Sequence, residues 1–287
     1  MVLTCPDGAV AMVVDSADPA EVDHGVAAWE TAIATLLPAG QTVPLVLATH
    51  PHADHIGDLP WLFARNPVEL LVDDGMTAKG SVYKAYAAAR ARGRINAYHP
   101  IADAPAPVAL CSGQVTVTLF APADLKPKAC ARDLNRCSVL ARVEYGDTRF
   151  LLTGDAERTE EAALLRDPAT AALLPADVLK VGHHGSDTAS TKPFLARVRP
   201  TCAVISAGTA DLSTRNSGPH GYHHPRIATL DALNAALPAG PMRAETVPAY
   251  GGHPARWQDH EVKEGVSLPA IAGDVVIASA GHHVTCR

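Results

Sequence analysis

The stretch Val43-Pro-Leu-Val-Leu-Ala-Thr-His50-Pro-His52-Ala-Asp54-His55 places three histidines and one aspartate directly after an apolar run. The run is short and rich in valine and leucine, which predicts a buried strand that ends at His50. Helical spacing resumes after His55, so the polar residues lie in a loop between a strand and a helix. Imidazole nitrogens and carboxylate oxygens are the ligands that zinc and similar divalent ions prefer. Four such groups in six residues predict two adjacent metal ions.

A second apolar run, Phe150-Leu-Leu-Thr-Gly154-Asp155, also ends on a carboxylate. A single acid after a strand is usually a turn former or a helix cap. Beside two cations its role changes, because a shared carboxylate offsets their mutual repulsion. We therefore predict that Asp155 bridges the two ions.

A third run, Val178 to Val181, leads into Gly182-His183-His184-Gly185-Ser186. Paired histidines are often plain surface residues, but their position after a strand favours metal binding. The flanking glycines let the backbone approach an ion closely, and the Ser186 hydroxyl is able to donate a hydrogen bond to substrate.

Gly221-Tyr222-His223-His224-Pro225 precedes a predicted helix. A loop before a proline-initiated helix explains this pattern as well as a binding role does. We place His224 at the rim of the site, as a substrate-binding candidate.

The remaining sequence predicts one α+β domain over residues 1–287. Its abrupt start leaves open that an N-terminal strand or leader is missing. Gly146-Asp147 between two apolar runs predicts a two-residue hairpin. The other expected strands cover 9–14, 69–72, 95–98, 115–120, 138–145, 148–153, 203–206 and 274–279. The expected helices cover 18–37, 56–65, 79–92, 159–165, 193–198 and 225–236.

Composition narrows the classes of protein. A net charge of −6 provides no general attraction for nucleic acid or for an anionic membrane. There is no apolar run of membrane-spanning length and no secretory leader, so the sequence favours the cytoplasm, or export if a leader has been removed. The six cysteines lack any CxxC pair, which argues against a zinc ribbon. In a chain of this size, buried free thiols are the favoured interpretation. A local Cys130–Cys137 disulfide is the alternative in an exported protein.

Together these motifs resemble the metallo-β-lactamase superfamily, and within it the hydrolase domain of ComEC/Rec2-type competence proteins. The matching segments are Val13–Asp15, Thr49–His55, Asn135–Ser138, Phe150–Glu157, Leu179–Ser186 and His224-Pro225. The resemblance implies an αββα sandwich of two mixed β-sheets flanked by helices.

The resemblance also implies roles for individual residues. It places His50 and His52 on one ion, Asp54 and His55 on the other with His183, and Asp155 between the two. In an alternative assignment, His184 binds the metal in place of His183. In the first assignment, His184 and Asp54 act in catalysis. Asp15 would orient a ligand histidine rather than bind metal.

Asn135 stands where many members of the superfamily carry a further histidine. An amide oxygen is a weaker ligand than imidazole, so we expect a looser first site, with zinc as the preferred ion and manganese as the alternative. Asn135 and Ser138 are counted, like Ser186 and His224, among the substrate-binding candidates.

The expected function is therefore metal-dependent hydrolysis by a hydroxide of a dinuclear site, with Asp54 orienting it. The resemblance favours a phosphodiester, in nucleic acid or in a small molecule. Lys126, Lys128, Arg132 and Arg136 form a local basic patch that would suit phosphate, although such patches are more often solvated loops. The alternatives are hydrolysis of a carboxylic ester, lactone or lactam, and a scaffold that binds a ligand without turnover. No membrane or protein partner is expected, and the oligomeric state stays open.

Overall fold

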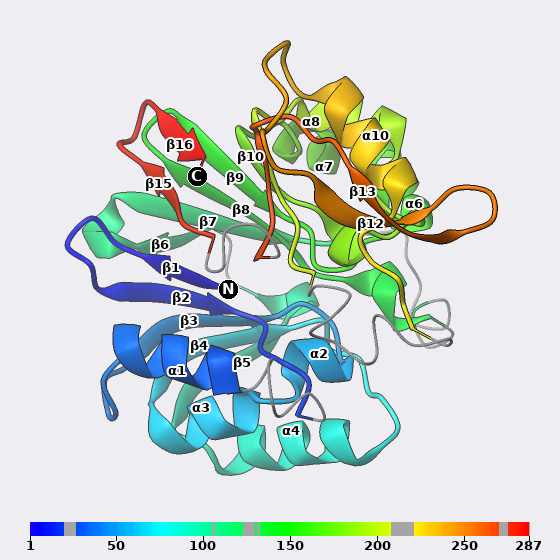
Figure 1. Ribbon diagram of the computed structural model, residues 1–287. Helices are drawn as coiled ribbons and strands as arrows, with labels where there is room; N and C mark the ends of the chain where they lie inside the picture. Colours follow the sequence, from blue (N-terminus) through cyan, green and yellow to red (C-terminus); the bar gives the residue numbers. More distant parts are fainter. Residues whose placement is uncertain are drawn as a thin grey trace. The chain divides into compact units, whose positions relative to one another are not determined.

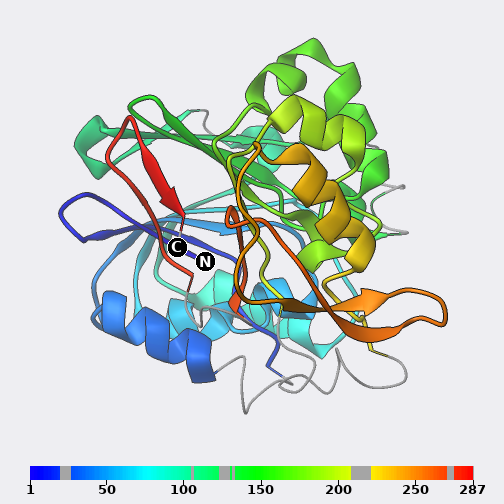
Figure 2. The same cartoon turned by 45° about the horizontal axis from the view of Figure 1, so that its top comes forward.

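The computed structural model describes residues 1–19, 27–104, 107–122, 130, 133–207, 221–269 and 275–286. The chain divides into two units (Figure 1, Figure 2). Unit 1 comprises Met1–Ala121 with Leu125–Val139, and unit 2 comprises Pro122–Asp124 with Leu140–Arg287.

Unit 1 contains a mixed sheet with the strand order β1-β2-β3-β4-β5. Its strands are β1 Val2–Thr4, β2 Val10–Val14, β3 Val43–Ala48, β4 Val68–Asp73 and β5 Ile95–Pro100. β1 and β2 form an antiparallel hairpin, and β2 to β5 run parallel. Because parallel strands end at the same edge of a sheet, the residues after β2 and β3 meet there with the end of β4. This edge carries Asp15, Thr49 and Asp73.

Helices cover one face of this sheet (Figure 1). They are α1 Ala27–Leu36, α2 Ala53–Ile56, α3 Leu59–Arg65 and α4 Ser81–Arg92. Their apolar side chains pack with alternate strand residues, including Val13, Val46 and Leu71, into one core. The helix predicted over 56–65 is divided at Gly57, where an added Cβ would lie 2.4 Å from the Ala53 carbonyl oxygen. The predicted start of α1 falls largely outside the described residues.

Unit 1 also holds the antiparallel pair β6 Val108–Leu110 and β7 Val115–Phe120. The described part of unit 1 also contains the 3-10 turns η2 Ile101–Asp103, η3 Cys111–Gly113 and η4 Leu134–Cys137.

Unit 2 contains strands in the order β14-β11-β10-β9-β8. They are β8 Leu140–Tyr145, β9 Thr148–Leu152, β10 Val178–Lys180, β11 Cys202–Val204 and β14 Val266–Ser267. β8 and β9 pair antiparallel through Tyr145 and Thr148, which confirms the predicted hairpin at Gly146-Asp147. β9, β10, β11 and β14 run parallel, so this sheet is also mixed.

Among the described residues of unit 2, the helices are α6 Arg158–Arg166, α7 Pro168–Leu173, α8 Lys192–Val198 and α10 Ile227–Ala236, and η5 Gly182–Gly185 is a 3-10 turn. Two antiparallel hairpins lie apart from the sheet, β12 Val247–Gly251 with β13 Arg256–His260 and β15 Ile277–Ser279 with β16 Val284–Cys286. α7, β12, β13, β14 and β16 are absent from the sequence prediction. The strand predicted to close the chain is β15, which pairs with β16.

All six cysteines form disulfides: Cys5–Cys111, Cys130–Cys137 and Cys202–Cys286. The expectation of buried free thiols was wrong, and the alternative Cys130–Cys137 pairing is present. The other two pairs join residues that are 106 and 84 positions apart. Only the fold brings such distant residues together, so spacing could not predict them.

Candidate metal centre

The loop after β3, residues 49–56, is called the metal loop below. Its two leading histidines face each other, with 2.9 Å between His50 Nε2 and His52 Nδ1. His50 is buried and His52 is half-buried. Two nitrogens that each lie about 2.0–2.1 Å from one tetrahedral zinc are roughly 3.3 Å apart. The observed separation is therefore close to that of two ligands of one ion.

Asp54 and His55 form a second donor pair in the same loop. The Asp54 carboxylate lies 3.5 Å from His55 Nε2. His55 is buried in α2, whereas the Asp54 side chain is 47% exposed. Asp54 is thus the donor of the metal loop that is open to a solvent molecule or a substrate.

Asp15 supports the metal loop from the end of β2. Its carboxylate accepts hydrogen bonds from the Thr49 amide at 2.7 Å and the Thr49 hydroxyl at 2.8 Å. It also lies 2.8 Å from His55 Nδ1. Burial raises the pKa of Asp15, but the charge and hydrogen bond of His55 and the Thr49 amide outweigh it and lower the pKa. Asp15 therefore stays ionised. Its contact with Nδ1 orients the His55 ring so that Nε2 faces the Asp54 carboxylate.

Asp155 is the corresponding carboxylate of unit 2. It follows β9 and is buried, after Gly154, whose positive φ of 53° turns the chain. The Thr153 hydroxyl donates to the Lys180 carbonyl at 2.8 Å, and the Lys180 ammonium donates to the Gly154 carbonyl at 3.2 Å. These bonds attach the end of β9 to the end of β10. They place Asp155 beside the two histidines that follow β10.

His183 and His184 both adopt left-handed backbone conformations, with φ of 47° and 53°. This conformation is uncommon outside glycine and is often retained where function needs it. His184 Nε2 lies 3.4 Å from Asp155 Oδ2, and the corresponding distance for His183 Nε2 is 3.9 Å. His184 Nδ1 lies 2.6 Å from the Ser206 carbonyl, which holds the ring with Nε2 toward Asp155.

His183 has polar neighbours that the sequence prediction did not include. Its Nδ1 lies 3.0 Å from Glu157 Oε1 and 3.2 Å from the Thr188 hydroxyl. The Thr188 hydroxyl also donates to Glu157 at 2.8 Å. Glu157 lies two residues after Asp155, and this proximity was the available signal for it. Nothing in the sequence pattern indicated Thr188 or Ser206.

The substrate-binding candidates fall in both units. In unit 1, Asn135 is buried in η4, and the Ser138 hydroxyl donates to its carbonyl at 3.1 Å. The Val139 amide donates to the Thr49 carbonyl at 2.8 Å, so this segment is attached to the metal loop. Contact of Asn135 and Ser138 with substrate stays a prediction. Lys126, Lys128 and Arg132 lie outside the described residues, and Arg136 pairs with Asp133 at 3.0 Å.

In unit 2, Ser186 is buried and its hydroxyl lies 2.9 Å from that of Thr188. His224 is also buried, with its ring centroid 5.2 Å from that of His183. Burial, reinforced by the nearby His183, His184 and Arg226, lowers the pKa of His224 to about 3. His224 is therefore a neutral ring beside the donors of unit 2.

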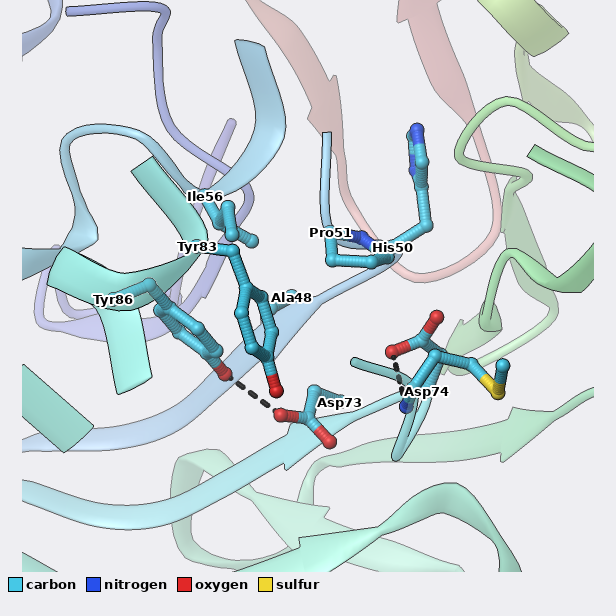
Figure 3. A pocket seen from close by; sticks show the side chains of 9 residues that line it. Ala48, His50, Pro51, Ile56, Asp73, Asp74, Tyr83 and Tyr86 are labelled. Atoms are coloured by element: carbon cyan, nitrogen blue, oxygen red, sulfur yellow. Dashed lines mark hydrogen bonds between the residues drawn. The ribbon is translucent and has the colours of Figure 1, made fainter. Parts of the chain in front are cut away.

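A hollow in unit 1 lies beside the metal loop, lined in part by His50, Asp73, Asp74 and Tyr86 (Figure 3). The Asp73 carboxylate accepts hydrogen bonds from Tyr86, Tyr98 and Arg90 at 2.7–2.9 Å. Burial raises the pKa of the neighbouring Asp74 to about 7, although the Met76 amide donates to it. These hydrogen bonds attach the end of β4 to α4 and β5 at the hollow that His50 also lines.

The donor groups fit divalent metal ions on the chemistry and spacing of each pair. His50 with His52, Asp54 with His55, and Asp155 with His184 bring nitrogen or carboxylate donors within 2.9–3.5 Å of each other. Nitrogen and oxygen donors at such separations suit zinc, and the carboxylates also suit manganese.

Comparisons with known proteins identify the family to which the chain belongs. The family model described as "Beta-lactamase superfamily domain" matches residues 26–244. "ComE operon protein 3" of Bacillus subtilis is 29% identical over 189 residues, which is 66% of this chain and 22% of that protein. "Recombination protein 2" of Haemophilus influenzae is 43% identical over 74 residues, 26% of this chain and 9% of that protein. The chain thus spans less than a quarter of the length of these relatives.

Among solved structures, zinc-bound PqqB from Methylobacterium extorquens is 14% identical, with a TM-score of 0.41. The match covers 71% of this chain and 74% of that one. In the described part of the chain, no helix has both the length and the apolar character needed to cross a membrane.

Proposed function

Because the chain belongs to the beta-lactamase superfamily, whose family model covers residues 26–244, we propose that it is a metal-dependent hydrolase that cleaves phosphodiesters. The α+β metallo-β-lactamase fold predicted from the sequence is confirmed by this membership and by the two mixed sheets with their helices. The observation that carries the proposal is the pairing of donor atoms at ligand spacing in both units.

The donors of the two units would hold two divalent ions, as the sequence motifs predict. His50 and His52 would bind one ion, Asp54 and His55 the other, and Asp155 both. We assign the remaining ligand to His184 rather than His183, because its Nε2 lies nearer to Asp155 and its Nδ1 faces the Ser206 carbonyl. When bound, the ions would supply the Lewis-acid chemistry that activates water near neutral pH.

The protein residues have separate tasks in this proposal. The exposed Asp54 carboxylate would orient the attacking water through the oxygen that does not bind metal. Asp15 orients His55, and Glu157 with Thr188 orients His183. His224, a buried neutral ring, would lie against the substrate beside His183.

The phosphodiester is favoured over other bonds by the similarity to competence and recombination proteins. The test is a hydrolysis panel of single-stranded DNA, double-stranded DNA, bis-nitrophenyl phosphate, a lactone and nitrocefin. Zinc-loaded and manganese-loaded protein would each be assayed. We expect turnover of the phosphodiesters, and cleavage of the lactone or nitrocefin alone would refute the proposal.

Asp155→Ala and His52→Ala should abolish this turnover without unfolding the protein. Activity is expected to fall by at least about 100-fold, since each change removes a metal ligand. Circular dichroism and thermal unfolding provide the folding control, and metal analysis by mass spectrometry gives the ion content. Full activity in a folded, metal-loaded variant would exclude that residue from the centre. A wild type that binds metal but turns over no substrate would support a binding scaffold instead.

A further inference from the structure

Unit 2 carries a cluster of rings just before α10 that the proposed metal chemistry does not use. This ring cluster consists of His223, Tyr250 and Trp257 with the Arg226 guanidinium, and Tyr222 precedes His223 in the chain. His223 stacks on Tyr250 with ring centroids 4.1 Å apart and an interplanar angle of 25°. Trp257 meets Tyr250 edge-on at 5.8 Å, and Arg226 lies 5.1 Å from the Tyr250 centroid. The β12–β13 hairpin thus supplies two of the rings.

His223 has an unusual backbone conformation between Tyr222 and His224. Its φ of 56° is unusual for a residue other than glycine, and its ring is held in place by Tyr250 and Trp257. The rings of Tyr222 and His224 are parallel within 22°, with centroids 6.2 Å apart. Tyr222 is 63% exposed, whereas His224 is buried. Tyr222 therefore presents an open aromatic face on a fixed backbone.

The ring cluster is attached directly to the metal donors of unit 2. The His224 ring lies 5.2 Å from that of His183. The Arg226 amide donates to the Gly185 carbonyl at 2.9 Å, and the Tyr250 amide donates to the Pro225 carbonyl at 3.0 Å. Arg226 also donates to the Tyr222 carbonyl at 3.2 Å. Starting from His183, the ring of His224 is therefore the first neighbour and the ring of Tyr222 the second.

An exposed tyrosine in this position suits a flat, unstacked partner. Aromatic side chains bind the faces of single-stranded bases, and a nearby arginine adds cationic attraction. Bases within a duplex are already stacked on each other and do not offer these faces. The net charge of −6 means that general attraction for phosphate is absent, so stacking has to provide much of the affinity.

We propose that Tyr222 is the platform on which a nucleobase beside the scissile phosphodiester stacks, which makes single-stranded nucleic acid the substrate class. This inference rests on the proposed function, because it assumes phosphodiester cleavage at the neighbouring metal donors. Tyr222 would determine specificity through contact with substrate and would bind no metal.

The test compares wild type with Tyr222→Ala and Tyr222→Phe on two substrates. One is an oligothymidylate, and the other is an oligonucleotide of equal length whose sites are all abasic. Met242→Ala is the matched control, since Met242 is another exposed apolar residue of unit 2. Steady-state cleavage by the manganese-loaded full chain is measured beside fluorescence anisotropy of labelled strands.

We expect Tyr222→Ala to raise the KM and Kd for oligothymidylate by about 5- to 150-fold, the effect of losing one stacked base. Its kcat/KM on the abasic strand should stay within about 2-fold of wild type, as should both values for Met242→Ala. Tyr222→Phe should resemble wild type, because the phenyl ring retains the stacking face.

The outcomes separate this inference from the proposed function. An active wild type whose oligothymidylate cleavage is unaffected by Tyr222→Ala would overturn the inference alone. Equal losses on oligothymidylate and on the abasic strand would also overturn it, since they would indicate general damage. A wild type that cleaves neither strand but hydrolyses bis-nitrophenyl phosphate or duplex DNA would overturn the inference and leave the proposed function standing. A wild type that hydrolyses none of these phosphodiesters would refute the proposed function.

Discussion

Asp15 has a large influence on the metal loop for a residue that we expect to bind no metal. It accepts hydrogen bonds from the Thr49 amide and hydroxyl, and it lies within hydrogen-bonding distance of His55. The same carboxylate thus holds the start of the metal loop and orients one of its ligands. Residues that hold metal ligands in this way commonly contribute 10- to 100-fold to metal affinity or activity.

Asp15→Asn should weaken zinc binding by about 10- to 100-fold, because the amide lacks the negative charge that orients and polarises His55. Competition with a chromophoric chelator measures the affinity. Asp103→Asn, at an exposed aspartate of unit 1, serves as the matched control. Unchanged affinity in a folded Asp15→Asn protein would show that Asp15 has no such role.

At the scale of elements, the candidate site residues follow the ends of strands. The metal loop follows β3, Asp155 follows β9, and His183 with His184 follows β10. Strand ends are well suited to this task, because the sheet fixes the backbone up to the last residue while the loop remains irregular. The loop after β10 is further held at its far end, where Glu161 of α6 contacts the start of α8.

Glu161 caps α8 from another helix. Its carboxylate accepts hydrogen bonds from the Thr191 amide at 2.9 Å, from the Thr191 hydroxyl at 2.6 Å and from the Ser190 amide. Burial raises the pKa of Glu161, against the opposing effect of these donors. Thr191 is the N-cap residue of α8, and its side chain makes no capping hydrogen bond. The Glu161 carboxylate therefore accepts hydrogen bonds at this helix end instead.

Glu161→Ala should lower the free energy of unfolding by about 2–4 kcal/mol, since it leaves buried donors unsatisfied. Urea unfolding followed by circular dichroism measures this loss. Glu161→Gln retains one acceptor and should lose less, whereas Glu264→Ala, at an exposed residue of unit 2, should be neutral. Equal stabilities of the Ala variant and wild type would mean that the contact does not support α8.

At the scale of the whole molecule, the three disulfides bear on where the protein works. Each cysteine is paired, and such pairing is maintained in oxidising compartments rather than in the reducing cytosol. We therefore propose that the chain works in an oxidising compartment, which favours export, the alternative that the sequence left open.

Protein purified without reductant should show no titratable thiol after denaturation. In the chain-entropy model, replacing Cys5 and Cys111 together by alanine should cost up to about 5 kcal/mol, because their loop is long. The same change at Cys130 and Cys137 should cost only about 2 kcal/mol. Thiol titration and urea unfolding provide the measurements. Detection of free thiols in the oxidised protein would contradict the pairing.

The sequence by itself determined the strands that end in the metal loop, at Asp155 and at His183. It did so because these signals are local: a short apolar run followed within a few residues by histidine or carboxylate. The Gly146-Asp147 hairpin was predictable for the same reason, since turn chemistry is encoded in two adjacent residues.

Only the tertiary structure decided which distant residues meet. The Cys5–Cys111 pair, the Ser206 carbonyl beside His184 and the stacking of His223 on Tyr250 join residues 22 to 106 positions apart. The β12–β13 hairpin has weak alternation and a proline in its first strand, so its rings were not assigned to any site. Contacts of this kind depend on packing of the whole chain, which no short pattern records.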